Sequence, residues 1–236
     1  MIDVDWKREA VLAIDELEPR LREVSDYIFS HPELKFEETL ASERLAAELE
    51  RDGFRVETGV AGMPTALRAL HPAASAGPTV AVIAEYDALP ELGHACGHNL
   101  IAAAALGASL ALGRIKGHLP GRLVFLGTPA EEGGGGKVKM IEGGVFGGID
   151  AAMMIHPSPF TAVGHGSLAI IEARIEFRGV AAHASAWPEK GVNALDAVIQ
   201  TFNGINALRQ HLRDGSRVHG IITHGGAKPN IVPDYA

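Results

Sequence analysis

Apolar side chains near the N-terminus recur at the three- and four-residue spacing of an amphipathic helix. Between residues 5 and 30 the spacing is carried by Val11, Leu12, Ile14, Leu17, Leu21, Val24 and Ile28. Pro32 cannot continue a helix, so this one is predicted to end before it. A second amphipathic helix is predicted over residues 37–51 and ends at Gly53. Two short strands, near 54–58 and 65–69, are predicted to form an edge hairpin.

The middle of the chain alternates apolar runs of strand length with helical segments. The runs lie at 79–84, 122–126 and 151–155, and the helices between them are predicted at 100–112 and 137–142. Continuous apolar runs are typical of strands that are buried on both faces. The order strand, helix, strand, helix, strand predicts an α/β domain in which a sheet lies between helices.

The hydrophobic pattern changes near residue 166. Residues 167–177 alternate polar and apolar side chains, which predicts a strand with one solvent-exposed face. A long helix is predicted at 192–212, and further strands near 218–223 and from Asn230 onward. We therefore predict a first domain over residues 1–166 and part of a smaller α+β domain over residues 167–236.

Composition and charge narrow the class of protein. The chain has 236 residues, of which 47% are apolar and 21% charged, a typical mix for a soluble globular protein. A net charge of −8 argues against a nucleic-acid-binding surface. The N-terminus lacks the basic and then apolar segments of a signal peptide. The longest nearly uncharged run, 99–113, looks too short and too rich in Gly and Ala to span a bilayer. These features predict a cytoplasmic protein that has neither nucleic acid nor membrane as a partner.

Each of the three apolar runs is followed by acidic or histidine side chains, and a Cys-Gly-His segment begins the buried helix. In open α/β sheets, ligands bind just beyond the carboxyl ends of the strands. We therefore expect these side chains to meet at one edge of the sheet. In chain order they are Asp87, Cys96, His98, Glu131, Glu132 and His156.

These residue types point to a metal centre. Thiolate, imidazole and carboxylate are the usual ligands of Zn²⁺ and Mn²⁺, and adjacent Glu131 and Glu132 divide naturally into a general base and a ligand. Taken singly, Cys96 could be a small buried apolar residue and His156 a structural histidine. The glycine run 133–136 fits neither a P-loop nor a dinucleotide-binding pattern, and we interpret it as room beside the metal.

The motifs together resemble metallopeptidase family 20, in the branch of hippurate, auxin-conjugate and aminobenzoyl-glutamate hydrolases and related dipeptidases. The resemblance covers almost the whole chain. It rests on Tyr86-Asp-Ala-Leu-Pro, His94-Ala-Cys-Gly-His98-Asn, Pro129-Ala-Glu-Glu132, His156-Pro, His31-Pro-Glu-Leu-x-Phe-x-Glu38 and Gly179-Val-Ala-Ala-His183. It implies a zinc-peptidase-like α/β catalytic domain with a mixed sheet sandwiched by helices, plus a smaller α+β lid and dimerisation domain.

The resemblance also implies a metal-binding role for four residues. Two divalent ions, Zn²⁺ or Mn²⁺, would be bound in each full-length protomer. Cys96 would bridge both ions as a thiolate, His98 and His156 would complete the site of one, and Glu132 would bind the other. Glu131 would be the general base that activates water and later protonates the leaving amine.

Three more positions receive roles from the resemblance. Asp87 would orient a metal ligand. His183 would reach across a homodimer to stabilise the oxyanion, and Asn230 would help to hold the substrate. The substrate implied is a dipeptide or an N-acyl amino acid of the aminobenzoyl type.

The chain departs from the family in length. Longer members have a returning segment that supplies one more histidine beside Glu132. We therefore expect this chain to be truncated at its C-terminus and to bind as few as one metal ion. Three hypotheses stay open: an active amidohydrolase or dipeptidase, a mononuclear hydrolase using Cys96, His98 and His156, and a non-catalytic metal-binding or dimerising remnant.

Overall fold

The computed structural model describes residues 5–236 apart from 74, 116, 118, 119, 165 and 167. Contacts divide the chain into two compact units, Met1–Thr161 and Ala162–Ala236. Ser167, with which the predicted second domain begins, lies outside the described residues. The assignment of a catalytic domain and a lid domain, with a boundary after residue 166, stays a prediction.

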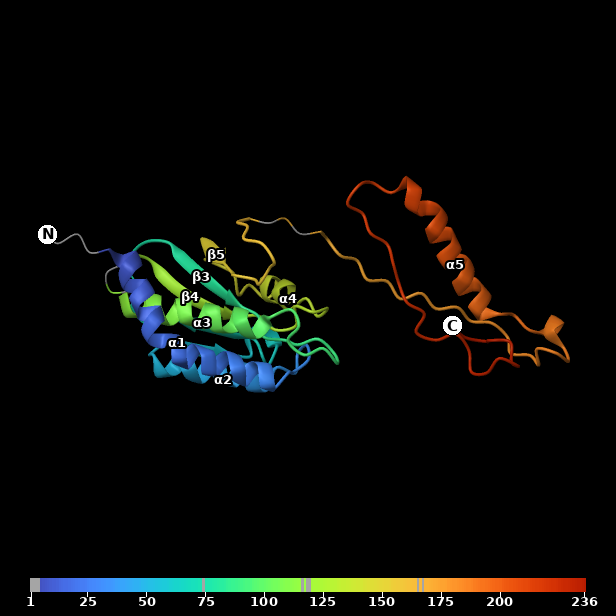
Figure 1. Cartoon of the computed structure of the whole chain (residues 1–236), viewed down its shortest axis with the longest axis horizontal. Helices are drawn as coiled ribbons and strands as arrows, with labels where there is room; N and C mark the ends of the chain where they lie inside the picture. Colours follow the sequence, from blue (N-terminus) through green and yellow to red (C-terminus); the bar gives the residue numbers. More distant parts are fainter. Residues whose placement is uncertain (1–4, 74, 116, 118–119, 165, 167) are drawn as a thin grey trace. The chain divides into compact units, whose positions relative to one another are not determined.

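Unit 1 is built on a mixed sheet in the strand order β1-β2-β4-β3-β5 (Figure 1). Strands β3, β4 and β5 run parallel, whereas β1 and β2 form an antiparallel hairpin that joins the sheet through β4. The mixed α/β class predicted from sequence is therefore confirmed, as is the edge hairpin. The bounds are Arg55–Thr58 for β1, Leu67–Leu70 for β2, Thr79–Ala84 for β3, Arg122–Gly127 for β4 and Ala151–Met153 for β5.

Helices cover both faces of this sheet. Successive side chains of a strand point to opposite faces, so Leu123 and Phe125 of β4 join one hydrophobic core while Val124 and Leu126 join the other. The first core is completed by α1 (Trp6–Ser30), α2 (Thr39–Arg51) and α3 (His98–Ile115). The second is completed by the 3₁₀ turn η1 (Val60–Gly62) and by α4 (Gly136–Glu142), which contributes the fully buried Met140.

Helix α3 lies in the interior of unit 1. Its 18 residues are, by length and composition alone, sufficient to cross a membrane, so the expectation that this stretch is too short was wrong. However, 67% of the helix is buried, and it packs against α1, β3 and β4. A helix that is apolar on all sides and enclosed by the rest of its own unit is typical of the core of a globular domain.

Strand β5 differs from the prediction of a strand that is buried on both faces. All three of its residues are exposed, and Met153 keeps 59% of its surface accessible. The strand lies at the sheet edge and pairs only with β3 among the described strands. Apolar composition predicted the strand correctly but did not predict its edge position.

Unit 2 contains one long helix, α5 (Ala194–Leu208), whose first turn is capped by the side chain of Asn193. Two 3₁₀ turns, η3 (Pro188–Lys190) and η4 (Arg209–His211), flank it. The strands predicted at 167–177, at 218–223 and from Asn230 are not formed among the described residues. Of the three segments, only the one from Asn230 takes part in isolated bridges, at Ile231 and Tyr235.

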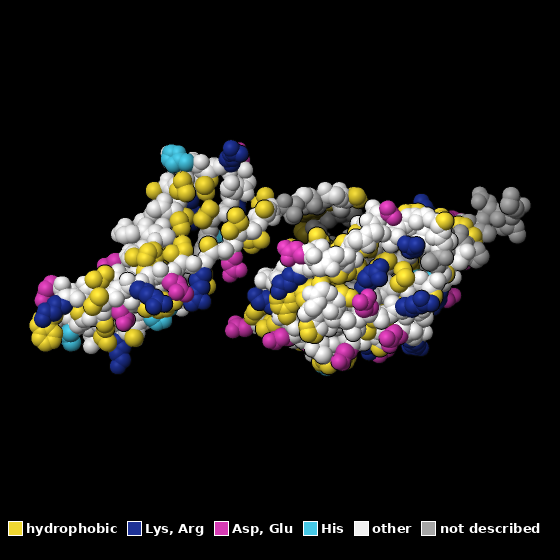
Figure 2. All heavy atoms as spheres, turned by 180° about the vertical axis from the view of Figure 1, so that it is seen from behind, with side chains coloured by type: hydrophobic (Ala, Val, Ile, Leu, Met, Phe, Trp, Pro, Cys, Tyr) yellow, Lys and Arg dark blue, Asp and Glu magenta, His cyan; other side chains and the backbone are white. Residues whose placement is uncertain are grey.

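The physical reason is that a strand needs a paired neighbour along its length. Without one, the apolar side chains of these segments remain at the surface. Ile170 and Ile171 are more than nine-tenths exposed, and hydrophobic side chains are visible on the surface of this unit in Figure 2.

Candidate metal centre

The three parallel strands bring distant segments to one edge of unit 1. Strand β3 pairs with β4 on one side and with β5 on the other, so the segments that follow these strands lie next to one another. Helix α3 begins at the same edge with His98. Two groups of potential ligand atoms result, each lying within 4.8 Å of one another: Glu85 with His98 and His156, and His98 with Glu131 and Glu132.

His98 is held by Asp87 in a defined orientation. Its Nδ1 lies 2.8 Å from the backbone carbonyl oxygen of Asp87 and 3.1 Å from Asp87 Oδ1. Both partners are acceptors, so Nδ1 carries a proton, and in the neutral ring Nε2 presents a lone pair. Because a metal-binding imidazole commonly donates its other N–H to a carboxylate or a carbonyl, this is the arrangement that metal binding requires.

The buried Nε2 of His98 has no hydrogen-bond partner among the described residues. Burial lowers the pKa of His98, but the hydrogen bond to Asp87 and the nearby carboxylates raise it more, so the net pKa is raised. Asp87 is also buried, yet the hydrogen bonds from His98 and from the backbone of Glu132 leave its pKa lowered. An unpartnered imidazole nitrogen in an acidic surrounding fits a bound cation.

The carboxylates of Glu131 and Glu132 lie equally close to His98 Nε2. They differ in exposure and in backbone hydrogen bonding. Glu131 Oε2 and Glu132 Oε1 both lie 3.9 Å from His98 Nε2. The backbone N–H of Glu132 donates to Asp87 Oδ2 at 2.8 Å, and its side chain is 19% exposed, against 43% for Glu131. Burial and the neighbouring Glu85 raise the pKa of Glu131, partly offset by Lys137. Glu131 is therefore the more accessible of the two carboxylates, and its pKa is raised.

Cys96 contacts Glu132 but belongs to neither of the two ligand groups found among the described residues. The hydrogen bond to Glu132, burial and the nearby carboxylates raise the pKa of Cys96 to about 11. Its role as a bridging metal ligand stays a prediction. Gly97, which follows it, has φ +78°, and a Cβ there would lie 2.9 Å from Pro157 Cγ. The Cys96 loop is thus packed directly against the segment that carries His156.

His156 resembles His98 in how its ring is held. Its Nδ1 lies 2.8 Å from the carbonyl oxygen of Pro157, so this nitrogen also carries the proton and Nε2 is available as a ligand. The two rings are nearly perpendicular, with centroids 6.0 Å apart. Of the predicted metal ligands, the structure therefore places His156 in one ligand group with His98, and Glu132 in the other group with His98 and Glu131.

Glu85 is a candidate site residue to which the sequence patterns assigned no role. It directly follows β3, its side chain is 2% exposed, and it forms an ion pair with Lys137 of α4. The available signal was its spacing from Asp87. Side chains two residues apart in extended backbone share a side, so a carboxylate at position 85 could have been placed with Asp87.

Close packing requires glycine at two of the positions 133–136. A Cβ at Gly134 would clash with Ala130 and with the ring of Phe36, and a Cβ at Gly136 would clash with the carbonyl of Pro129. Gly133 and Gly135 have φ of +100° and +65°, a backbone conformation that favours glycine. The interpretation of this run as room beside a metal stays a prediction.

His183 and Asn230 lie in unit 2, close to each other. The backbone N–H of Ala184 donates to the carbonyl of Asn230 at 3.0 Å, and His183 forms an isolated bridge with Ile231. His183 Nδ1 accepts hydrogen bonds from the backbone N–H groups of Ser185 and Ala186. The neutral ring therefore carries its proton on Nε2, which makes that nitrogen a hydrogen-bond donor.

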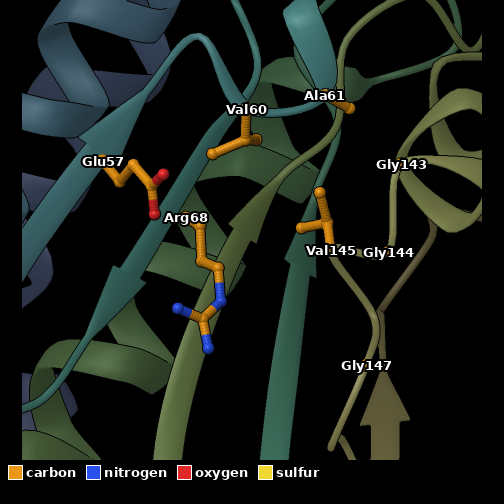
Figure 3. A pocket seen from close by; sticks show the side chains of 8 residues that line it. All are labelled: Glu57, Val60, Ala61, Arg68, Gly143, Gly144, Val145 and Gly147. Carbon is orange, nitrogen blue, oxygen red and sulfur yellow. The ribbon is translucent and has the colours of Figure 1, made fainter.

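A hollow of about 280 Å³ lies elsewhere on unit 1 (Figure 3). It is lined by Glu57 and Arg68, which are paired across β1 and β2, and by the segment around Val145. None of its lining residues belongs to the two ligand groups. The hollow is therefore separate from the two ligand groups.

Asp87 supports a prediction about metal affinity. Both of its oxygens act as acceptors, Oδ1 for His98 and Oδ2 for the backbone of Glu132. In Asp87→Asn, either orientation of the amide points its NH₂ group at one of these donors. We expect metal binding to weaken by about 10–100-fold, measured by calorimetric titration with Zn²⁺. The exposed Asp26→Asn is the control, and equal affinities for the two variants would contradict the role given to Asp87.

The fold and the ligand groups together define an α/β protein with a candidate divalent-metal centre, and comparisons with known proteins place it more closely. The profile of Peptidase family M20/M25/M40 matches residues 81–218. The chain belongs to this family.

Curated relatives and a solved structure agree with this assignment. The chain is 46% identical over 98% of its length to an Xaa-Arg dipeptidase of Mus musculus. It is 39% identical over 95% of its length to one of the subunits of the p-aminobenzoyl-glutamate hydrolase of Escherichia coli. A dinuclear metal-binding peptidase of the M20 family from Bacillus subtilis superposes with a TM-score of 0.60 at 25% identity, and the match covers 94% of this chain and 62% of that one.

The chain spans about half the length of the curated relatives that it matches. It covers 56% of the mouse dipeptidase and 50% of the Escherichia coli protein. The resemblance to metallopeptidase family 20 noted from sequence is confirmed, whereas the roles of individual site residues stay predictions.

Proposed function

We propose that this protein is a metal-dependent amidohydrolase or dipeptidase that cleaves the amide bond of a dipeptide or of an N-acyl amino acid of the aminobenzoyl type. One observation carries the proposal: the unpartnered Nε2 of the buried His98 is faced by carboxylates of Glu85, Glu131 and Glu132 within 3.9 Å. The names of the mouse and Escherichia coli relatives support the choice of substrate class.

The candidate site residues of unit 1 divide into metal ligands and a general base for amide hydrolysis. Divalent ions held by His98 and His156 on one side and by Glu132 on the other, with Cys96 as a shared ligand, would polarise the amide carbonyl and lower the pKa of water. Glu131, exposed to the solvent side of the cluster, accepts the proton of the attacking water on a carboxylate oxygen. As the C–N bond breaks, the same oxygen delivers that proton to the leaving nitrogen. The raised pKa of Glu131 supports both transfers, because a base that must later act as an acid works best near the ambient pH.

The proposal gives two further roles to residues of unit 2, oxyanion stabilisation and substrate binding. The Nε2–H of His183 would donate to the oxygen that becomes negative when water adds to the carbonyl carbon. Asn230, adjacent to His183, would hold the substrate. That this contribution comes from the second protomer of a homodimer is part of the same proposal.

The donor set is compatible with either of two metals. The carboxylates favour Mn²⁺, and a thiolate at Cys96 favours Zn²⁺. We propose up to two ions per chain.

Elemental analysis of the purified protein and a hydrolysis assay test the proposal together. Xaa-Arg dipeptides and p-aminobenzoyl-glutamate are incubated with the Zn²⁺- or Mn²⁺-loaded protein, and the released amines are separated by chromatography. Bound metal together with cleavage of either substrate supports the amidohydrolase. One ion per chain without cleavage favours the non-catalytic metal-binding module, and absence of binding for both ions contradicts a metal centre.

A further inference from the structure

Two buried side-chain atoms face each other in unit 1 without hydrogen-bond partners. They are Glu85 Oε2 and His98 Nε2, which lie 3.5 Å apart, and the two side chains are 2% and 1% exposed. Leaving a buried polar atom unsatisfied costs about 1–3 kcal/mol, more if the group is charged. Two such atoms in direct opposition therefore require an explanation, and a shared cation is one that satisfies both.

We propose that Glu85 is itself a metal ligand, completing a site with His98 and His156. The ligand atoms of these three residues all lie within 4.8 Å of one another. Tetrahedral ligands at about 2.0–2.2 Å from one ion lie about 3.3–3.6 Å apart. Glu85 Oε2 and His98 Nε2, 3.5 Å apart, already have this spacing, and a wider pair within the group has to close by about 1 Å when an ion binds. The inference rests on the proposed function only in requiring a divalent ion at His98.

Lys137 explains why the second oxygen of Glu85 is directed at His98. Its Nζ forms an ion pair with Glu85 Oε1, and this leaves Oε2 on the side of the imidazole. The ion pair and the metal bond use different oxygens and are therefore compatible. The alternative is that Glu85 serves only as the counter-ion of Lys137.

Two variants distinguish the ligand from the counter-ion. Glu85→Gln keeps the shape of the side chain and a carbonyl oxygen for Lys137, but it replaces the anionic ligand by a neutral amide. Lys137→Met removes the cation and leaves the carboxylate. If Glu85 is a ligand, Glu85→Gln weakens metal binding by at least about 10–100-fold, the range known for residues that only support a ligand. Lys137→Met keeps or strengthens binding, because a positive charge near the ion is lost.

The experiment titrates the purified metal-free proteins with Zn²⁺ and with Mn²⁺ in a calorimeter. The absorption spectrum of bound Co²⁺ reports the ligand set and is recorded in parallel. Of the two test variants, only Glu85→Gln is expected to change it. His156→Ala serves as the reference for a lost ligand and the exposed Glu43→Gln as the matched control. Thermal unfolding of the metal-free proteins establishes that each variant is folded.

Three results would overturn the inference. Wild-type affinity in Glu85→Gln rules out a ligand, and equal losses in Glu85→Gln and Lys137→Met assign Glu85 to the ion pair. Absence of metal binding by the unsubstituted protein removes both this inference and the metal centre. Metal binding that depends on Glu85, without hydrolysis of any substrate, leaves the inference standing and contradicts the proposed activity alone.

Discussion

Glu131→Gln is expected to lower kcat by about 10²–10⁴-fold while the protein keeps its full metal content. The amide has nearly the shape of the carboxylate but cannot accept a proton from water or return it to the leaving nitrogen. Because the side chain of Glu131 is 43% exposed, the substitution is expected to leave the fold unchanged. Steady-state kinetics and elemental analysis of the same preparation measure the two quantities.

The metal content of Glu131→Gln decides whether Glu131 is a general base or a metal ligand. The geometry alone allows both roles. Glu131 and Glu132 lie at the same 3.9 Å from His98 Nε2, so either carboxylate could bind an ion there. Loss of metal in Glu131→Gln would make Glu131 a ligand, and full turnover would remove it from the chemistry altogether. The control is Glu142→Gln, an exposed substitution on α4 that is expected to change neither quantity.

The location of the site could be predicted because its signals are local in sequence. A continuous apolar run predicts β3 within the bounds Thr79–Ala84, and the acidic residues that follow it must then lie at the carboxyl end of that strand. The same reasoning holds for β4 with Glu131 and Glu132. These signals depend on residues that are close together in the sequence: apolar runs, helix ends and the residues that follow strands. A single sequence therefore reveals them.

Pairing and distant contacts could not be predicted from the same patterns. The alternating segment that includes Ile170 has the composition of a strand, but no local feature says which segment pairs with it. The exposure of β5 depends in the same way on its place at the sheet edge. The proximity of Glu85 Oε2 to His98 Nε2 depends on Lys137 of α4, which lies 52 positions from Glu85 in the sequence.

Glu38 shows how a distant contact can support the site. Its side chain is completely buried and accepts three hydrogen bonds. Oε1 accepts from the backbone N–H of Phe36 at 2.9 Å and of Ala130 at 2.8 Å, and Oε2 accepts from the hydroxyl of Thr65 at 2.8 Å. Phe36 and Ala130 have φ of 65° and 57°, a left-handed conformation that is unfavourable for residues other than glycine. One carboxylate therefore holds two strained turns, and the second leads directly into Glu131.

Glu38→Ala is expected to lower the free energy of unfolding by about 3 kcal/mol or more, because three donors lose their acceptor at about 1–3 kcal/mol each. Relaxation of Ala130 should also displace Glu131 and Glu132 and weaken metal binding by about 10–100-fold. Denaturant unfolding and calorimetric titration with Zn²⁺ measure the two effects. The neighbouring Glu37→Ala, which is exposed, is the control.

Glu38→Gln separates the hydrogen bonds from the charge. The amide oxygen can still accept from Phe36 and Ala130, and the Thr65 hydroxyl can turn to accept from the NH₂ group. Burial raises the pKa of Glu38 in spite of the hydrogen bonds that it accepts, so the buried position disfavours the charge of the carboxylate. We therefore expect Glu38→Gln to restore stability and metal affinity to within about 1 kcal/mol of the unsubstituted protein. A Gln variant as defective as the Ala variant would show that the negative charge, rather than the acceptor geometry, supports the turn before Glu131.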